Sequence, residues 1–303
     1  MDTASVIKHG NATHVSGTLI ATGMNSSAKG MSFQGNLHAY EWDNDISEMA
    51  YEAANGLKVS NHSYGIKEGW TSEERVLRWY GDIEISQTED YKFGFYGDEA
   101  RDMDYIAYNS PDYLIVRSAG NHRGESPPSQ PIHHQYWDPT ELDWMWSYDI
   151  RQKDGGDDGF ESLAGASVAK NVLVVGAVAD VVTGYQNPGD IQMTDFSSWG
   201  PTDDGRIKPD VVANGVDLIS CYPPYINSYE TLQGTSMSAP NVTGSIGLLL
   251  PHQKNLYGNK NLLASTLKAL IIHTADQPDQ IPGPEYKHGW GIDEYLKGSP
   301  VDE

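Results

Sequence analysis

Two patterns of hydrophobic positions alternate along the chain and predict different elements. Short, nearly continuous aliphatic runs predict buried strands at residues 57–60, 113–119 and 171–178. Longer segments with apolar residues three or four positions apart predict helices at residues 13–21, 46–55 and 262–275. Strands that are apolar throughout and separated by helices are typical of a parallel sheet covered on both faces. The pattern therefore predicts an α/β fold in three layers, with a mostly parallel sheet between helices.

Two segments follow neither pattern clearly. Residues 36–40 are a candidate for a short strand. Residues 125–158 contain four prolines and several aromatic residues, and predict a long surface loop folded over the sheet. We expect Trp144 and Trp146 to pack beneath this loop, with a role in lining a peptide cleft as the alternative.

A serine follows a glycine at the start of one further apolar helix. The heptad Gly-Thr-Ser-Met-Ser-Ala-Pro, residues 234–240, leads into the small and aliphatic residues 241–250. A hydroxyl at a helix N-terminus lies where backbone N–H groups and the helix dipole favour negative charge. Acyl transfer needs such a place for the oxyanion that develops beside the nucleophile. An N-capping residue before a core helix gives a similar pattern, but the complete heptad favours Ser236 as a nucleophile.

Polar segments follow two of the predicted strands. Sites in parallel α/β sheets lie at the carboxyl ends of strands, where Asn121 and Ser63 are both expected. The side-chain amide of Asn121 is a candidate donor to a tetrahedral intermediate, and an asparagine in a turn is the alternative. The backbone groups of Ser63, Tyr64 and Gly65 are candidates for pairing with an extended peptide substrate.

Taken together, these motifs resemble those of the subtilisin-like serine peptidases, and in the same order. Residues 234–240 are similar to the nucleophile motif, 11–18 to the histidine motif, 61–65 to the substrate strand, 118–121 to the oxyanion segment, and 196–201 and 208–211 to the stretch before the serine. The resemblance covers nearly the whole chain. It implies a subtilisin-like fold and a serine endopeptidase that hydrolyses extended protein substrates through an acyl-enzyme on Ser236.

The resemblance leaves the catalytic base open between two residues. The family motif is His-Gly-Thr-His-Val-x-Gly or His-Ala-Thr-His-Val-x-Gly, and its first histidine is catalytic. A match without a gap places Asn11 at that histidine and His14 at the second, structural one. A match with two inserted residues uses His9 instead, but two residues advance a helix by about 3 Å and move the imidazole out of hydrogen-bond reach. We therefore expect Asn11 at the position of the base, and an amide cannot act as a general base.

The aspartate of the triad is a second departure from the family pattern. The resemblance implies an Asp-Ser/Thr-Gly segment a few tens of residues before the histidine, but only ten residues precede Asn11. Asp2, in Asp-Thr-Ala, is partly similar to this segment and is a candidate for the triad acid, although no apolar strand leads into it. We predict one subtilisin-like peptidase domain over residues 1–303 that lacks its first strand and the triad aspartate. The chain is then either a serine endopeptidase or an impaired or inactive relative that only binds peptides.

The composition of the chain limits the kinds of molecule that the protein is expected to bind. The formal net charge of −22 argues against nucleic acid and anionic membranes. The chain shows no transmembrane run and no signal peptide, and its single cysteine, Cys221, excludes an internal disulfide. The resemblance implies a secreted protein, and we expect a monomer that binds peptide or protein substrates. No cofactor and no metal are expected to be required: residues 154–159 offer calcium ligands but also fit a solvated acidic loop, and residues 133–134 lack zinc partners at the usual spacing.

Overall fold

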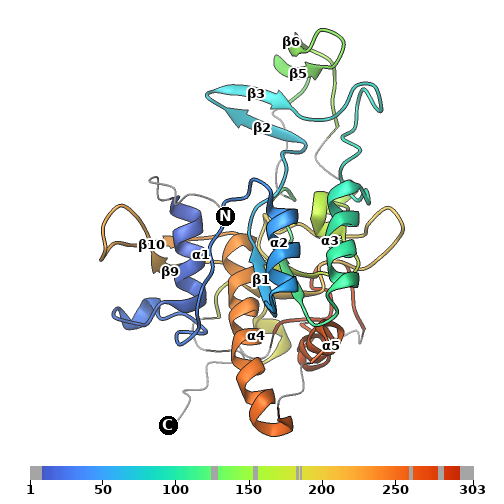
Figure 1. Cartoon of the computed structure of the whole chain (residues 1–303). Coiled ribbons are helices and arrows are strands. Elements are labelled where there is room, and N and C mark those ends of the chain that lie inside the picture. Colours follow the sequence, from blue (N-terminus) through green and yellow to red (C-terminus); the bar gives the residue numbers. More distant parts are fainter. Residues whose placement is uncertain are drawn as a thin grey trace.

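The computed structural model describes residues 9–123, 129–152, 156–181, 184, 186–258, 262–278 and 283–293. Its centre is a parallel sheet with the strand order β1-β4-β7-β8 (Figure 1). The strands are β1 (Val59–His62), β4 (Leu114–Ser118), β7 (Leu173–Val178) and β8 (Val211–Asn214). Each neighbouring pair is parallel, which confirms the predicted sheet type.

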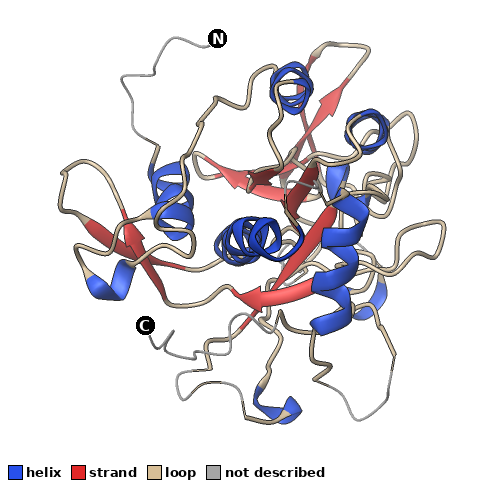
Figure 2. Ribbon diagram, turned by 60° about the horizontal axis from the view of Figure 1, so that its bottom comes forward, coloured by secondary structure: helices blue, strands red, loops and turns tan. Residues whose placement is uncertain are grey.

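Helices cover both faces of this sheet, as the sequence predicts (Figure 2). α2 (Asp45–Ala54) and α3 (Asp98–Asn109) pack on one face, and α4 (Thr235–Tyr257) and α5 (Ala264–Thr274) pack on the other. None of the helices in the described part of the chain combines the length and apolar character that crossing a bilayer requires. The parallel sheet with helices on both faces confirms the predicted three-layer α/β fold.

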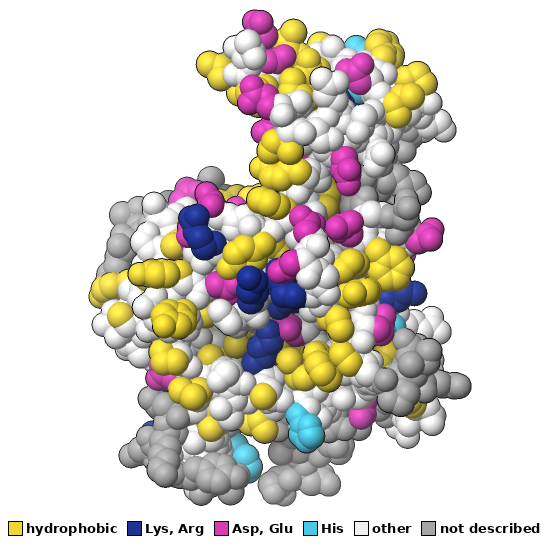
Figure 3. All heavy atoms as spheres, turned by 90° about the vertical axis from the view of Figure 1, so that its right-hand side faces the viewer, with side chains coloured by type: hydrophobic (Ala, Val, Ile, Leu, Met, Phe, Trp, Pro, Cys, Tyr) yellow, Lys and Arg dark blue, Asp and Glu magenta, His cyan; other side chains and the backbone are white. Residues whose placement is uncertain are grey.

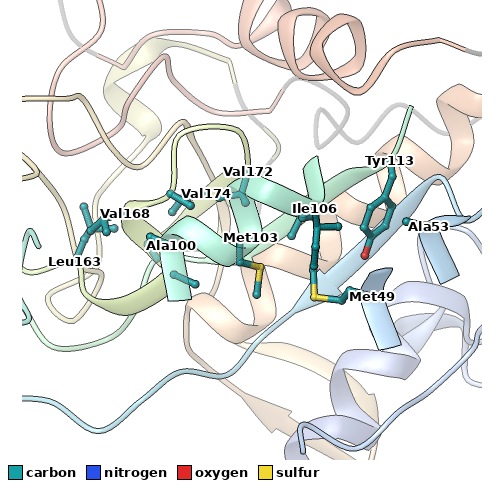
Figure 4. Close-up of a cluster of buried hydrophobic side chains, with 14 residues drawn as sticks. Met49, Ala53, Ala100, Met103, Ile106, Tyr113, Leu163, Val168, Val172 and Val174 are labelled. Atoms are coloured by element: carbon teal, nitrogen blue, oxygen red, sulfur yellow. The ribbon is translucent and has the colours of Figure 1, made fainter. Parts of the chain in front are cut away.

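The strand β4 shows how the two hydrophobic cores form. Successive side chains of a strand point to opposite faces of the sheet. Tyr113 and Ile115 therefore join Met103 of α3 in one buried cluster (Figure 4), whereas Leu114 and Val116 join residues of α4 and α5 in another. All four of these residues are completely buried. The apolar run over residues 113–116 is thus required here, because both faces of the sheet are covered.

α1 (Gly10–Ile20) lies beside α4 and against an antiparallel ribbon of β9 (Leu218–Cys221) and β10 (Tyr229–Leu232). A Cβ atom on Gly17 would approach the Ser220 hydroxyl to 2.3 Å, so only glycine allows the helix this close to β9. Short 3₁₀ segments lie at η1 (Ser26–Ala28), η2 (Asp157–Gly159), η3 (Gly165–Val168) and η4 (Pro188–Asp190).

A second sheet projects from the body of the molecule (Figure 1). It has the order β2-β3-β5-β6, and we call it the arm. Its strands are β2 (Trp70–Glu73), β3 (Val76–Trp79), β5 (His134–Asp138) and β6 (Asp143–Ser147). β3 pairs in parallel with β5, and the other two pairings are antiparallel.

The arm corrects two predictions made from the sequence. A loop without strands over residues 125–158 is wrong, because residues 134–147 form the β5–β6 hairpin. Trp146 does not pack beneath a loop, since 51% of its surface is exposed. The candidate strand at residues 36–40 is also wrong: this segment is irregular and exposed, and has no partner strand among the described residues. Strand formation depends on a pairing partner, which a local pattern does not reveal.

A buried charge cluster joins the sheet to α5 at the end where β7 and β8 begin. Asp210 accepts hydrogen bonds from the Val174 N–H at 2.7 Å and from the Lys208 ammonium at 2.6 Å, and its other oxygen lies 2.8 Å from the Lys268 ammonium. Both ammonium groups also donate to the Val172 carbonyl. Burial alone would raise the pKa of Asp210, but the two lysines hold this pKa below its ordinary value.

Candidate active site

The candidate nucleophile lies in the first turn of α4. The residue before the helix, Gly234, has φ 145° and ψ 161°, a conformation that is essentially restricted to glycine. Ser236 follows as the second helical residue, and Met237 is 1% exposed and packs against Val15 and Leu19 of α1. The glycine turn and the buried methionine together fix the hydroxyl at the helix N-terminus, where the dipole favours negative charge.

Substitution of Gly234 by alanine is expected to destabilise the protein by about 1–3 kcal/mol, because a Cβ atom is strained in this conformation. The free energy of unfolding in urea measures the effect. Gly189→Ala is the matched control: a Cβ atom there meets nothing within 4 Å and needs no positive φ. Equal losses for the two variants would contradict the assignment of strain to the turn.

Pro240 leaves one carbonyl near the start of α4 without its usual helical hydrogen bond. A proline has no N–H group, so the Ser236 carbonyl four residues earlier receives no bond from it in the helix. The Ser63 hydroxyl donates to that carbonyl instead, at 3.0 Å. Ser63 is held in turn by the Asn61 amide, whose oxygen accepts from the Thr243 hydroxyl on α4, both at 3.0 Å. The end of β1 is therefore hydrogen-bonded to the first turns of α4.

Asn121 lies beside the nucleophile turn, at the end of β4. Its Oδ1 accepts hydrogen bonds from the backbone N–H and the hydroxyl of Thr235, both at 2.9 Å. This orientation leaves the amide nitrogen as the group to be offered to a ligand. A Cβ atom placed on Gly234 would lie 3.5 Å from that nitrogen and 3.7 Å from the Ser236 backbone nitrogen. The Asn121 amide and the Ser236 backbone nitrogen therefore both lie close to the glycine turn.

The segment Ser63–Gly65 continues β1 past the sheet. Tyr64 is fixed from three sides: its hydroxyl donates to Asp45 at 2.9 Å and accepts from His62 Nδ1 at 2.6 Å, and its carbonyl accepts from the Arg117 guanidinium at 2.9 Å. A Cβ atom on Gly65 would lie 3.9 Å from the same guanidinium. The candidate substrate segment is therefore anchored through its side chain and one carbonyl.

His62 serves this anchor rather than the chemistry. Burial and the charge of Arg117 lower the pKa of His62 to about 3, so its imidazole is neutral at physiological pH. Its second nitrogen lies 2.7 Å from the Ser60 hydroxyl, so both ring nitrogens are engaged. Burial together with the Asp45 carboxylate raises the pKa of Tyr64, which keeps the phenol protonated as a donor. This histidine is neither free nor basic enough to accept a proton from Ser236.

Asn11 and Ser236 converge on one carbonyl. The Asn11 amide and the Ser236 hydroxyl each donate to the Ser63 carbonyl oxygen at 3.4 Å, so the two donor atoms are separated by no more than twice that distance. His9 lies at the N-cap of α1, is exposed, and holds Thr13 only through its backbone carbonyl. The hydroxyl of the candidate nucleophile is thus bonded to a carbonyl, and an asparagine is the side chain that shares it.

His14 lies apart from this site. It is fully buried in α1, and its Nε2 lies 2.9 Å from the Leu218 carbonyl on β9. Burial lowers its pKa below the ordinary value. The imidazole links α1 to β9, in keeping with the structural position that the sequence motif predicts for it.

Arg117, whose guanidinium holds the Tyr64 carbonyl, was not expected from the sequence. It is 3% exposed and follows three aliphatic residues of β4, and its Nε and Nη1 atoms have no hydrogen-bond partner in the described structure. Glu68 was also not expected; it is 6% exposed and lies 3.1 Å from His122, the residue after Asn121. A single arginine within the apolar run 113–119 was the available signal, because unpaired charges are costly in buried strands.

Two of the predicted sites lie wholly or partly outside the described residues. Asp2, considered as the triad acid, is one of them, and the candidate calcium segment, with Asp154 and Gly155, is the other. Among the residues that are described, no group of three or more histidine, cysteine, aspartate or glutamate side chains is placed to hold a metal ion. His133 stacks on Trp146 and Tyr148 instead, with ring centroids 4.2 and 4.7 Å apart.

A parallel sheet with a serine at a helix start and an amide donor at the end of a neighbouring strand is the architecture of a serine hydrolase. The model of the subtilase family matches residues 2–291, and the chain therefore belongs to the subtilase family, whose members are serine peptidases. The recognised resemblance is confirmed.

Two curated relatives agree with this assignment. Pyrolysin of Pyrococcus furiosus is 24% identical over 290 residues, which cover 86% of this chain and 19% of pyrolysin. Serine protease AprX of Bacillus subtilis is 35% identical over 129 residues, which cover 39% of this chain and 27% of AprX. The chain thus spans less than a third of the length of either relative.

Solved structures agree with the fold. The Clostridium perfringens CspB protease matches with a TM-score of 0.63 and 14% identity, over 94% of this chain and 79% of that one. Sphericase matches with a TM-score of 0.58 and 19% identity, over 94% of this chain and 77% of that one. At these identities the similarity concerns the fold alone.

Proposed function

We propose that this chain is a subtilisin-like endopeptidase domain that binds extended peptides and cleaves them only slowly, through an acyl-enzyme on Ser236. The observation that carries the proposal is the pair of hydrogen bonds from Asn11 and Ser236 to the Ser63 carbonyl. The candidate nucleophile and the candidate oxyanion donor lie at the same turn. We assign the position of the base to Asn11, whose amide does not titrate.

The proposed mechanism begins with an extended substrate pairing with the backbone of Ser63–Gly65. The scissile carbonyl then lies between the Ser236 hydroxyl, the Ser236 backbone N–H and the Asn121 amide. Attack by the hydroxyl forms the C–O bond of a tetrahedral intermediate, and the two N–H donors stabilise its oxyanion. The hydroxyl proton leaves to water, because Asn11 cannot accept it. Water protonates the nitrogen of the scissile bond, the C–N bond breaks and the amine leaves, which yields the acyl-enzyme. A second water molecule then attacks the ester carbonyl, the bond to Ser236 breaks, and the acid product and the serine hydroxyl are released.

The experiment combines peptide binding with turnover. An uncharged extended peptide is expected to bind saturably in fluorescence anisotropy, and a quenched version is expected to be hydrolysed slowly. Ser236→Ala removes the residual hydrolysis and retains binding, whereas Ser26→Ala, on an exposed serine, changes neither. Absence of binding, or hydrolysis that survives Ser236→Ala, contradicts the proposal.

A second candidate is a fully active endopeptidase with His9 as its base. The exposed imidazole at the N-cap of α1, two residues before Asn11, is the observation in its favour. Fast turnover that is lost on His9→Ala supports this candidate and removes the first one.

We also propose that the protein acts outside the cell as a monomer and requires no cofactor. Secretion is what the family resemblance implies. The proposed steps call on this chain's own serine, amide and backbone groups, and on no bound ion.

A further inference from the structure

The β5–β6 hairpin of the arm carries aromatic side chains on an open face. Trp137 is 41% exposed and Trp146 is 51% exposed, and Tyr148 just after β6 is 64% exposed. Trp137 lies opposite Trp144 in the antiparallel register, so residues 137, 144 and 146 share one face of the sheet. The opposite face holds the arm together, since Trp79 and His134 are fully buried there. On the open face Trp144 packs edge-on against Tyr80 and Trp137, whereas Trp137 and Trp146 keep large exposed surfaces.

Aromatic rings of the arm already hold cations. The Arg78 guanidinium lies over the Trp144 ring at 4.7 Å, and the Lys67 ammonium lies 5.6 Å from the Tyr80 ring. A cation over an aromatic face is attracted by the ring quadrupole, most strongly for tryptophan. His133 stacks on one side of the Trp146 ring, and the exposed parts of Trp146 and Trp137 offer the same attraction to a cation from outside.

Charge on the hairpin favours the same kind of ligand. Residues 132–150 contain Asp138, Glu141, Asp143 and Asp149 but no lysine or arginine. The nearby Arg151 is 2% exposed and lies over the buried Trp79 ring, and it also lies 3.6 Å from the Asp149 carboxylate. Asp149 is therefore partly neutralised, and Asp138, Glu141 and Asp143 supply the acidic charge of the hairpin. Figure 3 shows yellow hydrophobic and magenta acidic side chains on the projecting lobe. Carboxylates beside exposed tryptophans form a surface for lysine and arginine side chains.

The backbone of β6 adds a place for an extended chain. β6 is an edge strand that pairs only with β5 among the described residues. Natural edge strands are usually protected by lysine, proline or a bulge, and Asp143–Ser147 contains neither lysine nor proline. An edge of this kind accepts an extended peptide by strand addition, with alternate side chains of the peptide facing the sheet.

We propose that the edge of β6 and the aromatic face of the hairpin bind an extended segment rich in lysine and arginine, as an exosite for a protein substrate. The identity of the partner as a substrate rests on the proposed function, whereas the binding surface does not. Continuity supports the connection, because β2 begins five residues after Gly65, the end of the candidate substrate segment.

The test uses the full chain with Ser236→Ala, so that no peptide is cleaved. A fluorescent peptide that alternates lysine and valine is titrated in fluorescence anisotropy against the same peptide with glutamate. We expect the lysine peptide to bind, more weakly at higher salt, and the glutamate peptide not to bind. Trp146→Ala and Tyr148→Ala are each expected to weaken binding about tenfold.

Matched controls separate the hairpin from general surface effects. Trp290→Ala removes a tryptophan that is 41% exposed outside the arm, and is expected to leave the affinity unchanged. Glu141→Gln combined with Asp143→Asn is expected to weaken binding without removing an aromatic ring. Equal binding of both peptides, or binding that Trp146→Ala and Tyr148→Ala leave intact, overturns the proposal. Binding of the lysine peptide without binding of the uncharged cleft peptide supports the exosite and contradicts the proposed function alone.

Discussion

Asn11→His is expected to raise kcat for peptide hydrolysis about a hundredfold. In subtilisin, loss of the catalytic histidine lowers kcat by a factor of about 10⁶, and loss of the aspartate alone lowers it by a factor of about 10⁴ to 10⁵. A restored histidine without an orienting aspartate therefore recovers only part of the activity. The imidazole would stand where Asn11 now shares the Ser63 carbonyl with Ser236.

Initial rates on a chromogenic peptide between pH 5 and 9, about the titration range of histidine, provide the measurement. The gain is expected to appear as the pH rises through about 6.5, because only the neutral imidazole accepts a proton. Asn11→Gln is the control for a change of size without a base, and is expected to give no gain. His9→Ala is expected to have no effect. A gain in the glutamine variant, or a loss in His9→Ala, contradicts the assignment of position 11.

Asp210→Asn is expected to destabilise the protein by about 3–5 kcal/mol, because it removes the carboxylate that pairs with the buried Lys208 and the half-buried Lys268. Urea unfolding at neutral pH measures this loss. Asp98→Asn is the control: Asp98 pairs with Arg101 on the surface and is 85% exposed, so its loss is expected to be below about 1 kcal/mol. Similar losses for the two variants would show that the buried cluster contributes little.

The same cluster predicts how stability depends on pH. The pKa of Asp210 is lower in the folded protein than its ordinary value of 3.8. A carboxyl group with a depressed folded pKa stabilises the fold above its unfolded pKa, and this contribution is lost as the pH falls through the folded value. The free energy of unfolding is therefore expected to fall below about pH 4 in the parent protein, and to fall less in Asp210→Asn.

Several features of the candidate site follow from the sequence because they depend on local chemistry. The glycine turn before Ser236 requires a residue that tolerates φ 145°, and the chain supplies Gly234 there. The strand before Asn121 is aliphatic on both faces because helices cover both faces, so its carboxyl end is recognisable in the sequence. Sites in parallel sheets lie at the carboxyl ends of strands, so Asn121 and Ser63 were recognised as candidate site residues.

The arm and the charge clusters did not follow from the sequence. β5 pairs with β3, more than fifty residues earlier, and the aromatic residues of the hairpin become strand residues only through that pairing. Arg117 and Asp210 acquire their roles from partners on other elements, such as the Tyr64 carbonyl and Lys268 on α5. Local patterns carry no information on such distant contacts.

The sequence by itself determined the α/β class, the helix start at Ser236 and the strand end at Asn121, because glycine conformation and hydrophobic period act within a few residues. Only the tertiary structure brings the Asn11 amide and the Ser236 hydroxyl to the same carbonyl. Asn11 comes within reach of Ser236 because α1 packs against α4 and both meet the Ser63 carbonyl at the end of β1. That meeting joins three segments far apart in the chain, and it depends on the packing of the whole domain.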